Sequence, residues 1–270
     1  MTIAAFRGHS ANLVGVPTGL LASAAFNDYP LPLHIRGVHE GHPQLFRLLA
    51  KTAGHAEAAN IFQEYMDDTY CLQQQNLEVS PVRRFRASYL RLLKGWGFDA
   101  NSRESAVIKG WAESRFGLFP TFHKGSLARF ASNGWSRYVE EKMGSRFHNN
   151  DIYGQLDLLY EFCQLALSRW LRPGQHHVRL YRGVNDFSED NLLQGQPQPR
   201  SGPVMVRLNN VVSFTAHRSI ACEFGDYILE TLVPTAKILF FNNLLPNHAL
   251  KGEAEYLAIG GDYRVTVSYL

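Results

Sequence analysis

Residues 151–184 read DIYGQLDLLYEFCQLALSRWLRPGQHHVRLYRGV, and the spacing of the apolar residues changes within this stretch. In its first part they recur every three or four positions, which is the period of an α-helix. They are Ile152, Leu156, Leu159, Cys163, Ala166 and Trp170. Asp151 is a typical N-cap and Pro173-Gly174 a typical stop, so we expect a helix between them. Residues 178–184, rich in β-branched and aromatic types, predict a strand.

The helical period continues toward the N-terminus as far as about Pro43. Two further apolar stripes carry it. The first is Ile61, Phe62, Tyr65 and Met66, and the second is Phe85, Tyr89, Leu92, Leu93 and Trp96. We therefore expect residues 1–172 to form a mainly helical region that packs on the rest of the chain.

Residues 173–270 have a different texture, with short runs of β-branched and aromatic residues separated by Gly, Pro and Asn. Such runs predict strands. The predicted strands cover residues 178–184, 204–208, 211–214, 227–233, 237–241, 255–259 and 263–269, with one short helix at 219–224. Many short strands in one region favour an antiparallel sandwich or barrel over a doubly wound sheet. The expected fold class is α+β, with a helical N-terminal half followed by a mainly antiparallel β-sandwich core.

Composition limits the classes of function. Hydrophobic residues make up 45% of the chain and charged residues 19%, which is ordinary for a folded globular protein. The net charge of +3 is too small to favour a nucleic-acid partner. No apolar run of the sequence reaches the ~20 residues that a membrane-spanning helix needs.

Cys71, Cys163 and Cys222 are odd in number, far apart and outside any CxxC. This usage argues against both a disulfide framework and a thiolate metal site, and we expect a reducing, cytoplasmic location. An apolar run at residues 11–26 has some features of a secretion signal. Because Asn12 and Pro17 interrupt this run, we do not expect secretion.

Three short motifs stand in order in the β-rich half. They are Leu180-Tyr181-Arg182-Gly183, Ser213-Phe214-Thr215 and Gly252-Glu253-Ala254-Glu255-Tyr256. Each is weak alone. A strand arginine is usually solvated, a Ser-x-Thr usually reflects β-propensity, and a Glu-x-Glu usually lies exposed near a turn. Their order and spacing carry more information than any one of them.

The spacing of Glu253 and Glu255 is the most informative part. Residues two apart in an extended chain project to the same side, so both carboxylates would face one site. Neighbouring like charges disfavour each other, and the arrangement therefore needs a purpose. A reaction that develops positive charge beside an incoming cation supplies one. Cleavage of the nicotinamide–ribose bond of NAD is such a reaction, because a fixed carboxylate stabilises its oxocarbenium-like state.

An Arg on one strand, a Ser-x-Ser/Thr on a second and an ExE entering a third resemble the R-S-E class of ADP-ribosyltransferases, whose ExE form marks transfer to arginine. More narrowly, the chain resembles the dinitrogenase reductase ADP-ribosyltransferases of nitrogen-fixing bacteria. This resemblance extends almost end to end. It rests on residues 12–18 (NLVGVPT), Phe26-Asn27, Phe62 with Tyr65-Met66, Tyr181-Arg182-Gly183 and residues 252–265 (GEAEYLAIGGDYRV).

The resemblance implies a mono-ADP-ribosyltransferase with NAD as co-substrate. It would transfer ADP-ribose to an arginine of dinitrogenase reductase, the nitrogenase iron protein, and so reversibly inactivate nitrogen fixation. Glu255 would stabilise the cationic ribose, and Glu253 would grip and activate the acceptor guanidinium. Ser213 would hydrogen-bond and orient Glu255. A loop at residues 242–251 would present the two glutamates to the protein substrate.

The remaining motif residues are implied to bind the cofactor. Arg182 would hold a phosphate and the nicotinamide-side ribose with its guanidinium fork. Gly183 would let the backbone approach the nicotinamide amide. Thr215 would support the pocket, at a position where it replaces a serine but keeps the hydroxyl. Phe214 and Phe224 would supply an apolar or stacking wall, although core packing is the commoner use of such residues.

The helical half would recognise the protein partner, and the family implies regulation through a nitrogen-signalling protein. The basic residues of one predicted helix have two interpretations, a solvated face or a dock for an acidic partner, and the first is the more common. They are Arg83, Arg84, Arg86, Arg91 and Lys94.

No metal site is predicted. His39-Glu40-Gly41-His42 is one residue short of HExxH, so its histidines would not share a helix face. No GxGxxG follows a strand, and NAD would not be held by a Rossmann turn. Two alternatives stay open: a toxin-like R-S-E arginine transferase, and a catalytically silent NAD-binding or protein-binding module of the same fold.

Overall fold

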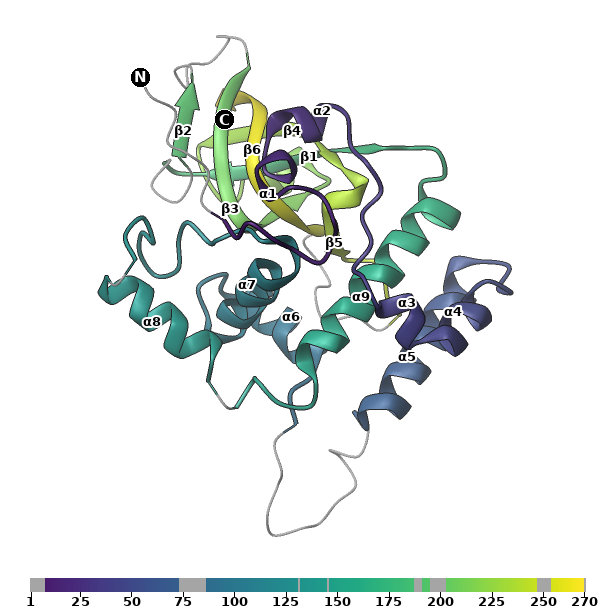
Figure 1. The fold of residues 1–270 in the computed structure, drawn as a ribbon. Coiled ribbons are helices and arrows are strands. Elements are labelled where there is room, and N and C mark those ends of the chain that lie inside the picture. The colour runs from purple at the N-terminus through teal and green to yellow at the C-terminus, as the bar shows by residue number, and fades with distance from the viewer. Residues whose placement is uncertain are drawn as a thin grey trace.

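The computed structural model describes residues 8–72, 86–130, 132–144, 146–186, 191–194, 203–246 and 254–269. Helices from the N-terminal half lie against an antiparallel sheet from the C-terminal half (Figure 1). This arrangement confirms the predicted α+β class. Within the described ranges, no helix has the length and apolarity that crossing a membrane requires.

The helical half contains α1 (Thr18–Leu21), α2 (Ala24–Asp28), α3 (Val38–Gly41), α4 (Pro43–Leu49), α5 (His55–Tyr70), α6 (Tyr89–Phe98), α7 (Arg103–Phe116), α8 (Asn133–Lys142) and α9 (Ile152–Ala166). The start of α9 is confirmed as predicted, because the Asp151 side chain accepts a hydrogen bond from the backbone N–H of Gly154. This bond satisfies one of the N–H groups that a helix start leaves unpaired. A π-helical turn, Leu167–Leu171, extends α9.

The sheet contains β1 (His177–Val184), β2 (Asn191–Gln194), β3 (Val204–Thr215), β4 (Tyr227–Pro234), β5 (Ile238–Phe241) and β6 (Glu255–Tyr269). A short helix α10 (Arg218–Ala221) follows β3, and a 3-10 turn (Thr235–Lys237) precedes β5. The strand order is β2-β3-β1-β4-β6-β5, and the pairings are antiparallel. Because β6 also pairs with β3, the strands β1, β4, β6 and β3 close into a ring.

Two pairs of predicted strands are each one strand. β3 unites the predicted strands 204–208 and 211–214, and β6 unites 255–259 and 263–269. Asn-Asn and Gly-Gly separate these runs in the sequence, and the predicted strands end on either side of them. The structure has a register shift there instead, between Leu208 and Val211. A bulge of this kind absorbs an extra residue without ending the strand.

The bulge persists because its asparagine side chains bond to the helical half. Asn210 donates hydrogen bonds to the carbonyl groups of Lys109 (2.9 Å) and Leu118 (3.0 Å). Gly260 on β6 lies so close to the bulge that a Cβ would overlap the carbonyl oxygen of Asn209. The Asn and Gly residues therefore bring two segments together, and do not mark chain reversals.

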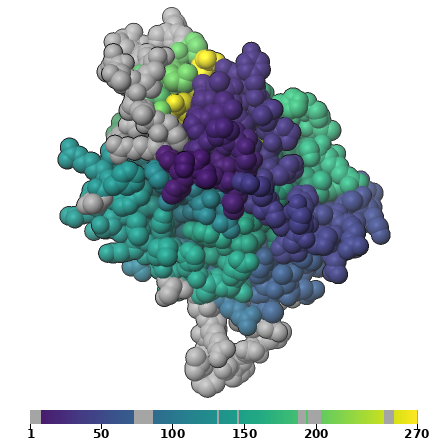
Figure 2. All heavy atoms as spheres, viewed as in Figure 1, coloured from purple at the N-terminus to yellow at the C-terminus, as the bar shows by residue number. Residues whose placement is uncertain are grey.

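One hydrophobic core runs through both halves of the described chain. α9 packs on β5, α7 on β3 and α2 on β6. The N-terminal segment lies across a face where helices and sheet meet (Figure 2), and Asn27 donates to the carbonyl group of Asp262 on β6 at 2.9 Å. This packing places the end of α6 beside the end of β3.

Candidate active site

A cleft of about 540 Å³ is lined by residues of both halves. Its volume lies in the range of pockets that bind small molecules. Of the residues assigned from the sequence, Arg182, Gly183, Ser213, Phe214, Thr215, Phe224 and Glu255 line it. Residues 96–100, from the end of α6 and the turn after it, also line the cleft, so the helical half contributes to its wall.

The described residues of the three motifs meet at one end of β3. Thr215 pairs with Tyr181 of β1 on one side and with Glu255 of β6 on the other. Arg182 is the next residue on β1. Because neighbouring strands lie ~4.8 Å apart, the strand pairing alone brings these distant parts of the sequence within contact distance.

Glu255 begins β6 and is buried, with 6% of its surface exposed. Its Oε1 accepts a hydrogen bond of 2.5 Å from the hydroxyl of Ser213. Ser213 is in register with Leu257, so this bond runs diagonally between neighbouring strands, within the reach of side chains on one face. The structure thus brings together the pair that the motifs single out.

Arg182 is half-buried in the wall of the cleft, and its Nη1 donates to the carbonyl group of Ser213 at 3.3 Å. Gly183 packs against α10 so closely that a Cβ would overlap the carbonyl oxygen of Ala221. The packing of α10 on β1 therefore requires a glycine here. The sequence motif alone suggests only a ligand-related reason for this residue.

The two aromatic residues expected at the wall differ in their surroundings. Phe214 is 3% exposed and its ring lies near that of Tyr263, with the centroids 6.1 Å apart. Phe224 lines the cleft with 53% of its surface exposed, and Phe98, the last residue of α6, lines it with 81% exposed. Exposed aromatic rings at a cleft offer stacking surfaces to a planar ligand. In the sequence, Phe98 comes just after the apolar helical stripe that ends at Trp96. Its position beyond this stripe is the only local sign that its ring is not part of the buried face.

Trp96 is another residue of the cleft that the sequence does not mark as functional. Its indole N–H donates a hydrogen bond of 2.8 Å to the hydroxyl of Ser213, and the ring is buried. In the sequence Trp96 belongs to an apolar helical stripe, which predicts burial. A stripe does not indicate which buried side chain reaches a polar group on another element.

Glu253 lies outside the described residues, as do residues 247–252. Ala254, directly before Glu255, has a φ of 44°, a left-handed conformation that is uncommon for a residue with a side chain. Before the gap, the carbonyl group of Leu244 accepts a hydrogen bond from His55 (2.9 Å) and that of Pro246 accepts one from Gln63 (3.2 Å). The predicted substrate loop therefore begins against α5.

Two of the basic positions noted in the sequence, Arg83 and Arg84, lie outside the described residues. Arg91 and Lys94 are exposed on α6. Both interpretations of this basic group stay open.

His39 and His42 belong to different hydrogen-bond networks. Nε2 of His39 and Nδ1 of His34 each lie 2.9 Å from Oε2 of Glu161, whereas His42 bonds the hydroxyl of Tyr65. The donor atoms of His34, His39 and Glu161 lie within 4.8 Å of one another, a spacing that could hold a metal ion. Hydrogen bonds from the two imidazoles to this buried carboxylate already account for the arrangement. The bond to Glu161 raises the pKa of His34, and burial opposes part of this change.

Comparisons with known proteins identify the family of the chain. A family model described as dinitrogenase reductase ADP-ribosyltransferase matches residues 11–267. The chain is 55% identical over 268 residues to the NAD(+)--dinitrogen-reductase ADP-D-ribosyltransferase of Rhodospirillum rubrum, covering 97% of this chain and 96% of that protein. No solved structure matches the chain. Since the family model covers nearly the whole chain and the relative is 55% identical to it, the chain belongs to the dinitrogenase reductase ADP-ribosyltransferase family.

Proposed function

We propose that the protein is a mono-ADP-ribosyltransferase that transfers ADP-ribose from NAD to an arginine of dinitrogenase reductase. The observation that carries this proposal is the 55% identity, over 97% of the chain, to an enzyme whose name states such a transfer to dinitrogen reductase. The cleft supports it, because Glu255 there accepts a hydrogen bond from Ser213 and Arg182 lies in the same wall. The ExE spacing of Glu253 and Glu255 supports arginine as the acceptor.

Glu255 is the residue to which we assign the first chemical event, cleavage of the bond between ribose and nicotinamide. Nicotinamide is already a pyridinium in NAD and needs no proton to leave. The barrier therefore lies in the positive charge that develops on the ribose. The carboxylate of Glu255, oriented by Ser213, stabilises this charge with little reorganisation. Its burial strengthens the attraction, because charges interact more strongly away from bulk water.

We assign NAD to the cleft. The guanidinium of Arg182 binds a phosphate in bidentate fashion and orients the nicotinamide-side ribose. Phe224 and Phe98 offer exposed rings to the aromatic parts of NAD. Thr215 supports the same wall from β3. Gly183 keeps the backbone of β1 bare for the nicotinamide amide, in addition to the room that it makes for α10.

Glu253 is assigned to the acceptor. An arginine side chain is protonated at neutral pH, and it becomes a nucleophile only if a carboxylate orients it and takes a proton as the new bond forms. The product is a bulky, doubly anionic adduct on the docking surface of dinitrogenase reductase. Such an adduct blocks docking to the partner by bulk and by charge.

We further propose that residues 1–172 recognise the protein substrate and that residues 173–270 form the NAD-binding core. The start of the substrate loop against α5 supports the first assignment. A cytoplasmic location is supported by Cys71, Cys163 and Cys222, which are all free thiols. Regulation through a nitrogen-signalling protein is what the family suggests.

The test is incubation of the protein with dinitrogenase reductase and NAD labelled in its adenylate part, followed by mapping of the label. We expect label on one arginine of dinitrogenase reductase, with one nicotinamide released for each label. Nicotinamide release without protein label would identify an NAD hydrolase. The absence of both would contradict the proposed function.

A further inference from the structure

Trp96 connects the helical half to the proposed catalytic carboxylate. It lies in α6, outside the β-rich half that carries the three motifs. Its indole N–H donates at 2.8 Å to the hydroxyl of Ser213, and that hydroxyl lies 2.5 Å from Oε1 of Glu255. The two hydrogen bonds form a continuous chain from a helix of one half to the carboxylate of the other.

The chemistry of the groups fixes the direction of the two hydrogen bonds. An indole N–H can only donate, whereas a serine hydroxyl has one proton and two lone pairs. The oxygen of Ser213 therefore accepts from Trp96, and its own proton points to Glu255. A serine hydroxyl without such a donor rotates to suit whichever partner is near. Consecutive hydrogen bonds also polarise and strengthen one another.

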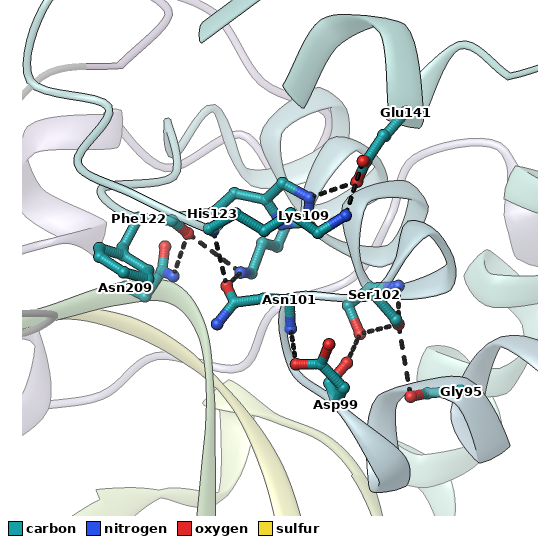
Figure 3. Close-up of polar contacts among 11 residues, drawn as sticks. Gly95, Asp99, Asn101, Ser102, Lys109, Phe122, His123, Glu141 and Asn209 are labelled. Atoms are coloured by element: carbon teal, nitrogen blue, oxygen red, sulfur yellow. Dashed lines mark hydrogen bonds and ion pairs between the residues drawn. The ribbon is translucent and has the colours of Figure 1, made fainter. Parts of the chain in front are cut away.

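The turn that follows Trp96 is held in place by polar contacts around Lys109 (Figure 3). The backbone N–H of Asn101 donates to the side chain of Asp99 at 2.8 Å, and Nζ of Lys109 donates to the side chain of Asn101 at 3.3 Å. Nζ also donates to the carbonyl group of Phe122 at 3.0 Å. The same ammonium lies 5.8 Å from the centre of the Trp96 ring, within the range of a cation–π contact. The indole is thus presented by an ordered corner of the helical half.

We propose that Trp96 is a positioning residue for ADP-ribosyl transfer, which acts by directing the hydroxyl of Ser213 to Glu255. The inference rests on the proposed role of Glu255. It gives the helical half a second task besides recognition of the partner, because the indole N–H that directs the hydroxyl of Ser213 comes from this half.

Two substitutions at Trp96 separate its N–H from its bulk. Trp96→Phe removes the N–H and keeps most of the ring. Trp96→His is smaller, but its Nε2 can occupy the position of the indole nitrogen and donate again. The matched control is Trp111→Phe, because Trp111 on α7 is also buried and its N–H donates at 2.7 Å to Asp157. Ser213→Ala and the double variant Trp96→Phe with Ser213→Ala complete the set.

Nicotinamide release and labelling of dinitrogenase reductase are measured over a range of NAD concentrations, with circular dichroism and thermal unfolding as controls for folding. We expect the kcat of Trp96→Phe to fall about three- to tenfold, the size of one lost hydrogen bond, with an unchanged KM for NAD. Trp96→His should recover part of this loss, and Trp111→Phe should keep the wild-type kcat. Trp96→Phe should cost nothing further in the Ser213→Ala background, because both act on one contact.

Wild-type turnover in Trp96→Phe, or full multiplication of the two losses in the double variant, would overturn the proposal. A purely structural role would make Trp96→His worse than Trp96→Phe, since the smaller ring leaves a larger cavity. That order would also overturn it. If Trp96→Phe does not fold, Trp96→His must exceed Ser213→Ala in kcat for the proposal to stand. Failure of the wild type to release nicotinamide in the presence of dinitrogenase reductase would contradict the proposed function instead.

Discussion

Two tryptophans on adjacent helices, α6 and α7, donate their indole N–H groups to different kinds of site. Trp111 bonds Oδ1 of Asp157, whose two oxygens also accept from Nε and Nη2 of Arg115 at 2.7 and 2.8 Å. Trp96 bonds Ser213, which bonds Glu255. The first carboxylate is paired with a guanidinium inside the fold. The second lies in the wall of a cleft and is oriented by a hydroxyl.

This difference separates a carboxylate that we expect to be structural from the one that we propose to be catalytic. A guanidinium that binds in bidentate fashion occupies both oxygens of a carboxylate, so Asp157 stabilises the fold. A hydroxyl orients Glu255 without bringing a charge of its own, and the carboxylate lines the space that a ligand enters. Substitution of Glu255 should therefore affect the reaction, and substitution of Asp157 should affect stability.

The largest effect is expected for Glu255→Gln, which keeps the shape of the side chain and removes its charge. Both nicotinamide release and transfer should fall by ~10²–10³, as expected when electrostatic stabilisation of a transition state is lost. NAD binding, measured by titration, should persist. Turnover near that of the wild type would place the catalytic carboxylate elsewhere.

Glu253→Gln should have a narrower effect, since Glu253 is assigned to the acceptor and not to the sugar. Transfer to dinitrogenase reductase should fall by about 10², a usual contribution of a positioned general base, while slow nicotinamide release remains. The ratio of hydrolysis to transfer should rise, and parallel assays of both products measure it. Equal losses in Glu253→Gln and Glu255→Gln would show that the two glutamates act as one unit.

Asp157→Asn tests the structural side of the comparison. Breaking a fully buried ion pair costs about 3–5 kcal/mol. Because the side chains of Arg115 and Asp157 are 17% and 10% exposed, we expect a smaller loss of roughly 2 kcal/mol in the free energy of unfolding. Urea unfolding measures this loss, and the kcat of the folded variant should match the wild type. A large loss of kcat with unchanged stability would contradict the structural role of Asp157.

The smallest effect concerns Glu161, a third buried carboxylate, and its partner His34. The pKa of His34 is raised, so the folded state holds this proton more tightly than the unfolded state. The resulting stabilisation is fully present below the ordinary histidine pKa of ~6.5 and is lost as pH rises through the raised value. His34→Gln should therefore lower the unfolding temperature slightly at acidic pH and leave it unchanged at alkaline pH. The same difference at every pH would rule out this linkage.

Local sequence predicts those parts of the fold whose stabilising contacts lie between residues close together in the chain. The start of α9 could be predicted because the N-cap Asp151 and the apolar stripe are both written in consecutive residues. The bulge at Asn209-Asn210 could not, since it depends on bonds to the carbonyl groups of Lys109 and Leu118, far away in the sequence. The short strand β2 also lacks a local signal, because its four residues, NLLQ, are too few to show a period.

The candidate site divides in the same way. Ser213 and Glu255 were assigned because the motifs resemble a known class, and strand pairing then brings them together. Trp96 and Phe98 belong to a helix whose pattern predicts only an apolar face. Their proximity to the cleft results from how α6 packs against the end of β3, and such tertiary packing has no pattern of its own in the sequence.

The contact between β1 and α10 limits how this cleft can change in evolution. A Cβ on Gly183 would overlap the backbone of Ala221, and a Cβ on Gly225 would overlap the backbone of Val184. Neither position can hold a residue with a side chain, and a change at one position does not make room at the other. Gradual substitution therefore cannot reshape this wall without separating the strand from the helix. Substitutions that change ligand preference are easier to accommodate at exposed positions such as Phe98 and Phe224.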